Sequence, residues 1–336
     1  MEIRKLNALR GIAALIVVFS HFANFSRGPL HQLLNDSGQV GVMLFFVLSG
    51  FLMSVLYLER PCDRGHVRGY ALARAGRVMP LYIIVVGLSF LLWQLGLVGY
   101  LYQVDSAAVL ASHLLFFYGN SVLWTIPAEM LFYGLFLLLW WCYQRRPPYF
   151  YLACVASLLL VIIFKFPRPR GDLLGIPFDI QFFRALPFFI SGLLLGQLYR
   201  HWPVPGYLCR KPSALLLLLI PFLFPEVFAA ITGNRYLVWI NLEVVALVAA
   251  AFFAVVFLVP DSNRLLANPL GDFFGRISYS LYLLHLPVLA LVKRMELGST
   301  ALSLAVFLGL AVLLSWLSYR LVENPLRLWI RGWGGA

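Results

Sequence analysis

Hydrophobic residues gather along this chain in runs of close to twenty, separated by short polar segments that hold most of the charges. A helix needs about 20 apolar residues to cross roughly 30 Å of hydrocarbon, so runs of this length can span a membrane. The pattern predicts an all-α polytopic integral membrane protein, a bundle of about ten transmembrane helices over residues 7–26, 39–58, 79–98, 123–143, 149–166, 182–199, 213–231, 236–259, 277–294 and 299–320.

The basic residues predict the orientation of these spans. Most of the 26 lysines and arginines fall in alternate connecting segments, counted from the N-terminus. The positive-inside rule therefore places both termini in the cytoplasm. A mean hydropathy of +0.86 with 12% charged residues excludes a soluble domain. The net charge of +12 is explained by arginines that face anionic lipid, so we expect membrane lipids and no nucleic acid as partners.

The first apolar run carries two ionisable residues, Arg10 and His21. They are eleven residues apart, which at about 100° per residue brings them within roughly 20° of one direction on a helix. Ionisable groups inside a span are costly and usually face protein or a wet cavity. Arg10 alone could snorkel to the interface, but two such residues on one face favour a functional pair. We expect this run to be an uncleaved span, since no small-residue cleavage site follows it.

The segment before the third predicted span is short and strongly arginine-rich, and includes Arg68, Arg74 and Arg77. Arg74 and Arg77 are three residues apart and would share one face of an amphipathic turn, just before Pro80 begins the next span. Topogenic charge is one explanation. The other is an anion site for a cytoplasmic phosphate-bearing cosubstrate, because the guanidinium fork suits phosphate oxygens.

The fourth predicted span places a carboxylate inside the membrane, at Glu129, with Tyr133 four residues later on the same helix face. A carboxylate at that depth must be paired, protonated or in contact with water. Glu129 is therefore either the structural partner of an intramembrane arginine or a member of the active site. Tyr133 is a candidate for contact with the substrate.

The ninth predicted span carries a polar stripe on an otherwise apolar helix. Ser278, Tyr282 and His285 follow one another at spacings of four and three residues, so they line one face. Hydrogen bonds to neighbouring helices would explain the serine and the tyrosine. His285 could be a satisfied core histidine, and all three are also candidates for binding the substrate.

The last span is expected to end at Pro325, which cannot continue a helix with a normal hydrogen bond. Around this proline lie Arg320, Glu323 and Arg327. Their charges predict a cytoplasmic cluster that anchors the end of the chain at the membrane surface.

Six blocks of this sequence, in this order, resemble the acyltransferase-3 family of membrane acyltransferases. The blocks are LRGIAALIVVFSHF, GVMLFFVLSGFLM, ARAGRVMPLY, WTIPAEMLFY, RISYSLYLLHLPV and SYRLVENPLR. The likeness extends from about residue 5 to residue 328. It implies a ten-helix domain in the bacterial inner membrane that transfers an acyl group, usually acetyl from acetyl-CoA, to a carbohydrate or glycolipid hydroxyl of the cell envelope.

The resemblance also implies roles for individual residues. Arg10 and His21 match the paired residues of the family's first helix, and Glu129 matches the acid of its fourth helix. Arg74 and Arg77 match the cytoplasmic arginine motif, so with Arg68 they are expected to bind the CoA phosphates. Two positions depart from the common pattern: Met43 stands where many members have aspartate, and Met130 where many have a second acid.

The expected chemistry is transfer from a thioester to a sugar hydroxyl, which needs a base for the hydroxyl proton and donors for the developing oxyanion. Histidine suits the role of base at neutral pH, so His21 is the candidate. No metal is expected. One transmembrane acyltransferase domain is predicted over residues 1–330, with a short cytoplasmic tail at 331–336 and no soluble module after it. The alternative is a polytopic transporter or flippase for a lipid-linked glycan, in which the same charges would line a pathway.

Overall fold

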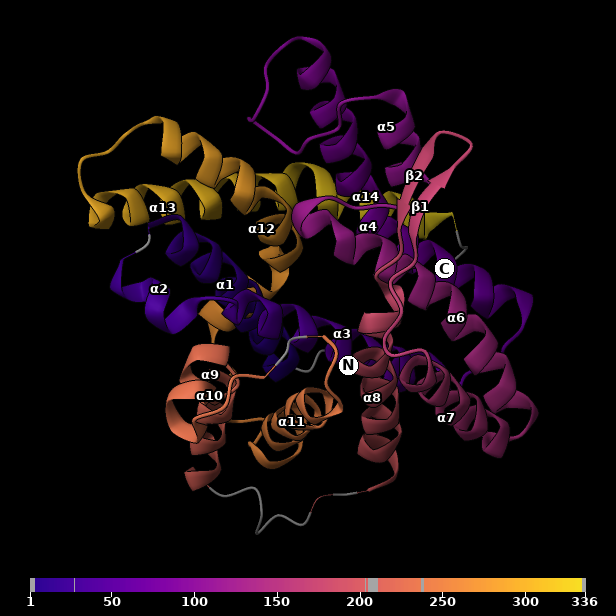
Figure 1. The fold of residues 1–336 in the computed structure, drawn as a ribbon. Coiled ribbons are helices and arrows are strands. Elements are labelled where there is room, and N and C mark those ends of the chain that lie inside the picture. Colours follow the sequence, from indigo (N-terminus) through magenta and orange to yellow (C-terminus); the bar gives the residue numbers. More distant parts are fainter. Residues whose placement is uncertain (1–3, 27, 203, 205–210, 237–238, 334–336) are drawn as a thin grey trace. The chain divides into compact units, whose positions relative to one another are not determined.

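The computed structural model describes residues 4–26, 28–202, 204, 211–236 and 239–333, and their regular structure is almost entirely helical (Figure 1). Seven helical segments in this part of the chain are long and apolar enough to cross a membrane, and a bent pair of helices adds an eighth. Two further apolar helices, α7 (Pro147–Ile163) and α11 (Leu242–Phe253), are shorter. The described chain thus has seven or eight helices that could span a membrane, as a helical membrane protein does, and ten spans remain a prediction.

The chain divides into two compact units. The first contains residues 1–59, 156–166 and 184–278, and the second contains residues 60–155, 167–183 and 279–336. Each unit is therefore assembled from segments far apart in the sequence. The long helix α12 (Pro269–Arg294) begins in the first unit and ends in the second.

The core of the first unit is the pairing of α1 (Arg4–Ser26) with α3 (Ser37–Tyr57). A side chain at Gly41 of α3 would overlap the backbone of Ala13, and one at Gly50 would overlap the backbone of Phe189 in α8 (Phe182–His201). Close approach of this kind is what small residues permit in membrane bundles, as expected for this glycine-rich run. The helix α2 (Pro29–Leu34) connects α1 to α3.

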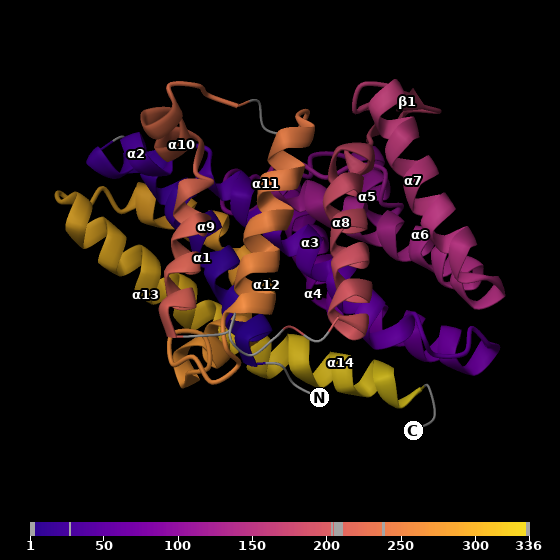
Figure 2. The same cartoon turned by 90° about the horizontal axis from the view of Figure 1, so that it is seen from below.

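The seventh predicted span, at 213–231, is not a single straight helix. It consists of η2 (Lys211–Leu218), α9 (Leu219–Phe222) and α10 (Pro225–Thr232), with a bend of 98° before Pro225 (Figure 2). The cause is local, because a proline disfavours helical geometry in the residue that precedes it and donates no backbone hydrogen bond. A broken span or a re-entrant loop replaces the predicted straight one.

The first unit also contains η3 (Ala254–Leu258), which follows α11 directly.

In the second unit, α4 (Arg64–Gln94) is a continuous helix of 31 residues. The helix therefore does not begin at Pro80, because the arginine-rich segment forms its first four turns. Asp63 caps the helix by accepting a hydrogen bond from the backbone N–H of His66 at 2.9 Å. This bond holds the pKa of the Asp63 carboxyl below its usual range.

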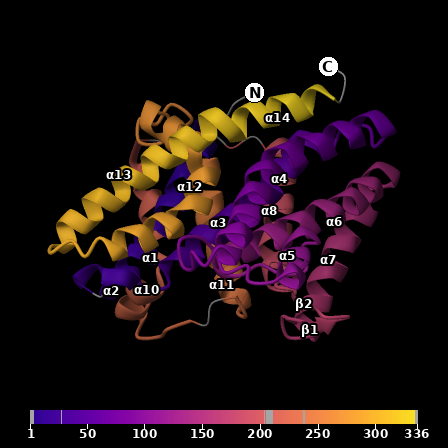
Figure 3. The same cartoon turned by 90° about the horizontal axis from the view of Figure 1, so that it is seen from above.

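The C-terminal span also continues past its predicted end. The helix α13 (Thr300–Ser318) leads through the π-helical turn η4 (Tyr319–Glu323) into α14 (Asn324–Gly332). Pro325 therefore does not end the helix. It lies in the first turn of α14, where its missing N–H is not needed. The helix α14 packs beside α4 (Figure 3), and it contains the first two residues of the predicted tail, residues 331–332.

The remaining elements of the second unit are connected by longer loops. They are α5 (Ala107–Leu114), η1 (Ser121–Trp124), α6 (Thr125–Arg145) and a hairpin of β1 (Arg170–Leu173) and β2 (Ile176–Asp179). The hairpin, which the hydropathy pattern does not predict, pairs Arg170 with Asp179 and packs beside α5 (Figure 1).

Candidate functional site

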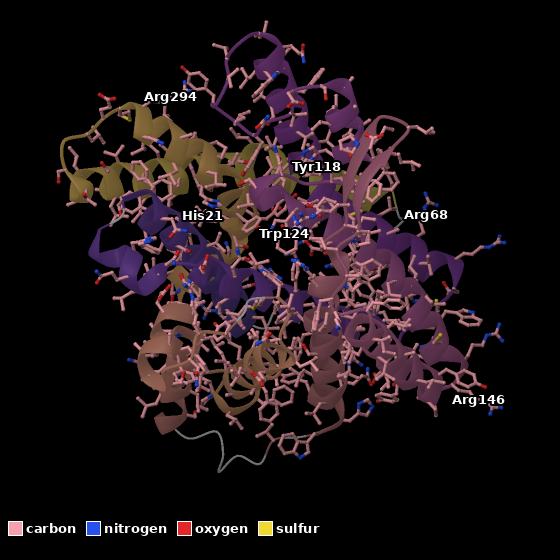
Figure 4. All side chains as sticks on the ribbon, viewed as in Figure 1. His21, Arg68, Tyr118, Trp124, Arg146 and Arg294 are labelled. Carbon is pink, nitrogen blue, oxygen red and sulfur yellow. The ribbon has the colours of Figure 1, made fainter. Side chains whose placement is uncertain are left out.

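His21 lies on α1 with its ring half-buried (Figure 4). Its Nδ1 lies 2.9 Å from the carbonyl oxygen of Val17, one turn earlier. Because a carbonyl only accepts hydrogen bonds, this contact places the proton on Nδ1 and leaves the lone pair on Nε2. The backbone thus fixes the neutral tautomer whose Nε2 can accept a proton.

Arg10 lies three turns before His21 on the same helix, also half-buried. The next residue, Gly11, is in close contact with the first part of α12: a side chain there would come within 2.8 Å of Phe274 Cβ. This contact fixes the helix at the level of Arg10. Further along, the Ser20 hydroxyl donates to the carbonyl of Leu34 at 2.9 Å, which fixes the other end of α1 near His21.

A second polar group is centred on Tyr133, a buried residue of α6 in the second unit. The Tyr133 hydroxyl donates a hydrogen bond to the carboxylate of Glu129, so these residues share a helix face as predicted. The guanidinium carbon of Arg74 lies 5.9 Å from the Tyr133 ring centroid, within the range of a cation–π interaction. The charges of Glu129, Arg74 and Arg77 all act on Tyr133. The structure therefore brings together four of the predicted site residues.

Two further tyrosines, one on α4 and one on α12, bond to the backbone around this cluster. Tyr70 of α4 is buried and donates its hydroxyl proton to the backbone carbonyl of Tyr133 at 2.9 Å. Tyr279 of α12 donates to the carbonyl of Val78 at 2.6 Å, in the same turn of α4 as Arg77. Tyr279 also interacts electrostatically with Glu129. A polar region inside the second unit thus joins α4, α6 and α12.

Glu323 is buried, with 4% exposure, and accepts a hydrogen bond from the Ser280 hydroxyl at 2.9 Å. The expectation that it belongs to a surface anchoring cluster is therefore wrong. The π-helical turn that contains it packs against α4. Such turns add one residue to a helix and occur often at functional sites. Glu323 also acts electrostatically on Tyr279.

The side chain of Arg68 is exposed (Figure 4), whereas those of Arg74 and Arg77 on the same helix are half-buried. Its Nη2 donates to the carbonyl of Trp333 at 2.7 Å, just after the end of α14. This bond holds α14 against α4. Its exposed position would let Arg68 reach an anion from the surface, and in this structure it bonds to a backbone carbonyl.

The polar stripe of α12 makes its hydrogen bonds mainly with backbone carbonyls. Ser278 bonds to Gly275 at 2.9 Å within the helix, and Tyr282 bonds to Val122 at 3.0 Å. His285 is fully buried and its Nδ1 lies 2.8 Å from the carbonyl of Tyr282. Ser278 belongs to the first unit, whereas Tyr282 and His285 belong to the second. Tyr282 also interacts with Glu129, which extends the Tyr133 cluster along α12.

The predicted residues thus fall into two groups in different units: Arg10 and His21 in the first, and Arg74, Arg77, Glu129, Tyr133 and Tyr282 in the second. Four supporting residues are not among the predicted ones: Tyr70, Tyr279, Ser280 and Glu323. Tyr279 and Ser280 are in the same RISYSLYLLHLPV block as the predicted stripe, on other helix faces. The buried position of Glu323 depends on the π-turn, which changes the helix face that follows it.

Within the described parts of the chain, no three His, Cys, Asp or Glu side chains are placed to hold a metal ion. Cys62, Cys142 and Cys154 are free thiols, and Cys209 lies outside the described residues. Burial raises the pKa of the Cys62 thiol.

The family model described as "Acyltransferase domain" matches residues 3–320. The chain belongs to this family. The match contains both groups of predicted residues, on α1 and around Tyr133, as well as Arg68 of α4.

Two similar proteins, from Staphylococcus aureus strains COL and MRSA252, are each named "Putative O-acetyltransferase" and are 25% identical to this chain over 366 aligned positions. These alignments cover 96% of this chain and 57% of the relatives, so the chain spans little more than half their length. "Protein 2 in picA locus" of Rhizobium radiobacter is 35% identical over 85 residues, which cover 25% of this chain and 41% of that protein. No solved structure matches the chain.

Proposed function

We propose that this chain is a membrane O-acyltransferase that transfers an acyl group, acetyl in the first instance, from acyl-CoA to a hydroxyl of an envelope carbohydrate or glycolipid. The family match over residues 3–320 carries the proposal of acyl transfer. The names of the Staphylococcus relatives agree with an O-acetyl product. The carbohydrate acceptor, the acetyl-CoA donor and the bacterial inner membrane are expectations from the resemblance of the six sequence blocks.

In the proposed reaction, His21 is the general base. Its Nδ1 proton is held by the Val17 carbonyl, so Nε2 can accept the proton of the acceptor hydroxyl as the oxygen attacks the thioester carbonyl. The tetrahedral intermediate then collapses and the C–S bond breaks. The thiolate of CoA leaves and receives the proton from the imidazolium, so the base is regenerated and no further reactant is needed.

The oxyanion of the intermediate needs a hydrogen-bond donor. Arg10 and His21 are eleven residues apart on one helix, about 16 Å along its axis, so we assign Arg10 another role. Arg10 would orient the site or hold the donor. Removal of its charge would then lower the rate of the reaction.

Arg74, Arg77 and Arg68 are proposed to bind the phosphates of the CoA donor from the cytoplasmic side, given the orientation that the basic residues predict. Arginine forks bind phosphate through charge-assisted hydrogen bonds. Glu129 and Tyr133 would hold Arg74 in position, since Tyr133 contacts both residues.

Turnover of radiolabelled acetyl-CoA by the purified protein, in the presence of membrane glycolipids, tests this function. We expect release of CoA with label transferred to an alkali-labile ester on the glycolipid fraction. The proposal is wrong if the wild-type protein binds the donor but neither hydrolyses nor transfers acetyl. Translocation of a lipid-linked glycan without acetyl turnover would indicate the transporter or flippase instead.

A further inference from the structure

The helices α14 and α4 come close together in the arginine-rich part of α4. Gly76, between Arg74 and Arg77, has no side chain, and α14 fills the space that one would occupy. A Cβ atom at Gly76 would be 3.2 Å from Ile330 Cβ and 3.4 Å from the carbonyl oxygen of Arg327. The backbone of Arg327 is thus placed beside the turn of α4 that carries two predicted phosphate-binding residues.

The Arg327 side chain is only partly satisfied. Its Nη2 donates to the Asn324 side-chain oxygen at 2.6 Å, which fixes one end of the guanidinium. Its Nε is buried and has no hydrogen-bond acceptor among the described residues. No carboxylate in the described ranges forms an ion pair with Arg327. The nearby acid Glu323 instead accepts a hydrogen bond from Ser280.

A buried N–H group without an acceptor is unfavourable. This cost is removed when an anion with several acceptor oxygens binds at this place. Phosphate is such an anion, and an arginine bonds it strongly because the guanidinium presents parallel N–H donors.

We propose that Arg327, held by Asn324, is a further binding residue for a phosphate group of the acyl-CoA donor. This inference rests on the proposed function and adds α14 to the donor site on α4. Binding of the donor would then connect the end of the chain to the arginine-bearing turns of α4, with Gly76 as the point of contact. An anionic lipid headgroup presents the same phosphate chemistry, so the experiment must distinguish the two sources.

Arg327→Gln tests the assignment, and Arg331→Gln is the matched control, because Arg331 is an exposed arginine on the same helix. Both variants and the wild type are purified into phosphatidylcholine nanodiscs. Steady-state kinetics are measured with acetyl-CoA and with its analogue that lacks the 3′-phosphate. The thermal shift produced by CoA alone is a second readout that needs no acceptor.

We expect Arg327→Gln to raise the KM for acetyl-CoA about tenfold or more, as the loss of a charged hydrogen bond does, with kcat changed less than about twofold. The thermal shift with CoA should fall in parallel, and Arg331→Gln should match the wild type. If the variant is unstable, Arg327→Lys keeps the charge without the fork and should give a smaller rise in KM.

This inference is overturned if the wild type is active and Arg327→Gln has the same KM for acetyl-CoA and the same thermal shift with CoA. The proposed function would then remain intact. A defect that appears only when phosphatidylglycerol is present also overturns it, since Arg327 would then bind lipid. The proposed function itself is rejected if the wild type is inactive and CoA does not raise its melting temperature.

Discussion

The two groups of candidate residues are built in different ways. In the first unit, a single helix carries both Arg10 and His21, and one backbone carbonyl sets the tautomer of the histidine. In the second unit, the cluster around Tyr133 needs α4, α6 and α12 together. The α1 pair can be recognised from helical periodicity alone, whereas the Tyr133 cluster exists only after three helices pack. We therefore expect the first group to act in the chemical step and the second to act in binding.

The largest effect is expected for His21. His21→Ala removes the proposed base, so kcat should fall about 10²- to 10⁴-fold while the KM for acetyl-CoA changes little. Steady-state kinetics of the purified protein give both values. His31→Ala is a matched control, because His31 is also a half-buried histidine of the first unit and its ring bonds to the Asn24 side chain at the surface. If the two variants were equally active, His21 would not be the base.

Arg74 and Arg77 should give the opposite kinetic signature. Arg74→Lys with Arg77→Lys keeps the charge but removes the guanidinium forks, so the KM for acetyl-CoA should rise about 10- to 100-fold with a small change in kcat. The same assay on both sets of variants compares the two units directly. A fall in kcat at constant KM would contradict the division between chemistry and binding.

The next effect is a loss of stability at low pH, which we expect from His113, a buried histidine of the second unit. Burial lowers the pKa of His113 to about 4, and its Nδ1 bonds to the Tyr82 hydroxyl at 3.1 Å. The folded state therefore takes up fewer protons than the unfolded state below about pH 6.5, so stability is lost as the pH falls towards 4. Between pH 7 and pH 5 the loss should be about 2 kcal/mol.

Thermal unfolding in detergent at several pH values measures this loss. His113→Gln cannot be protonated, so its melting temperature should depend less on pH than that of the wild type, even if it is lower at pH 7. Equal pH dependence in both proteins would show that other groups cause the loss. Activity at neutral pH is expected to survive this substitution, since His113 has no role in the proposed site.

The smallest effect on stability is expected for Ser280, whose hydroxyl bonds to Glu323. Ser280→Ala removes the hydroxyl that bonds to the buried carboxylate, and should lower stability by about 1 kcal/mol. Ser315→Ala is the control: Ser315 is also buried in the second unit, but its hydroxyl only bonds to the Ala311 carbonyl of its own helix. The difference between their melting temperatures measures the contacts of the Ser280 hydroxyl with Glu323 and, at 3.3 Å, with the Ser318 hydroxyl. No difference would mean that Ser280 contributes nothing to the position of the carboxylate.

The hydropathy pattern predicted where helices lie but not where they begin, bend or end. It assigned the arginines of α4 to a loop because charged residues lower the local hydropathy. The helix nevertheless continues through them, capped by Asp63 and uninterrupted by Pro80. The bend before Pro225 could have been predicted from that proline, since proline disfavours helical geometry in the residue before it.

Helical spacing predicted local neighbours but not contacts between helices. Glu129 and Tyr133 are four residues apart and do form a hydrogen bond. The contact of Arg74 with Tyr133 required α4 to pack beside α6, which no spacing within either helix encodes. Glu323 was assigned to the surface because it lies among arginines, and its burial follows from the π-turn and from the contact of that turn with α4.

The most direct test of the central claim is the O-acetyl content of the host's envelope glycans, measured by proton NMR before and after mild alkali. A strain that lacks the protein is complemented with the wild type or with His21→Ala at matched membrane levels. We predict that deletion removes O-acetyl groups from one glycan fraction, that the wild type restores them and that His21→Ala does not. Full restoration by His21→Ala would contradict the account.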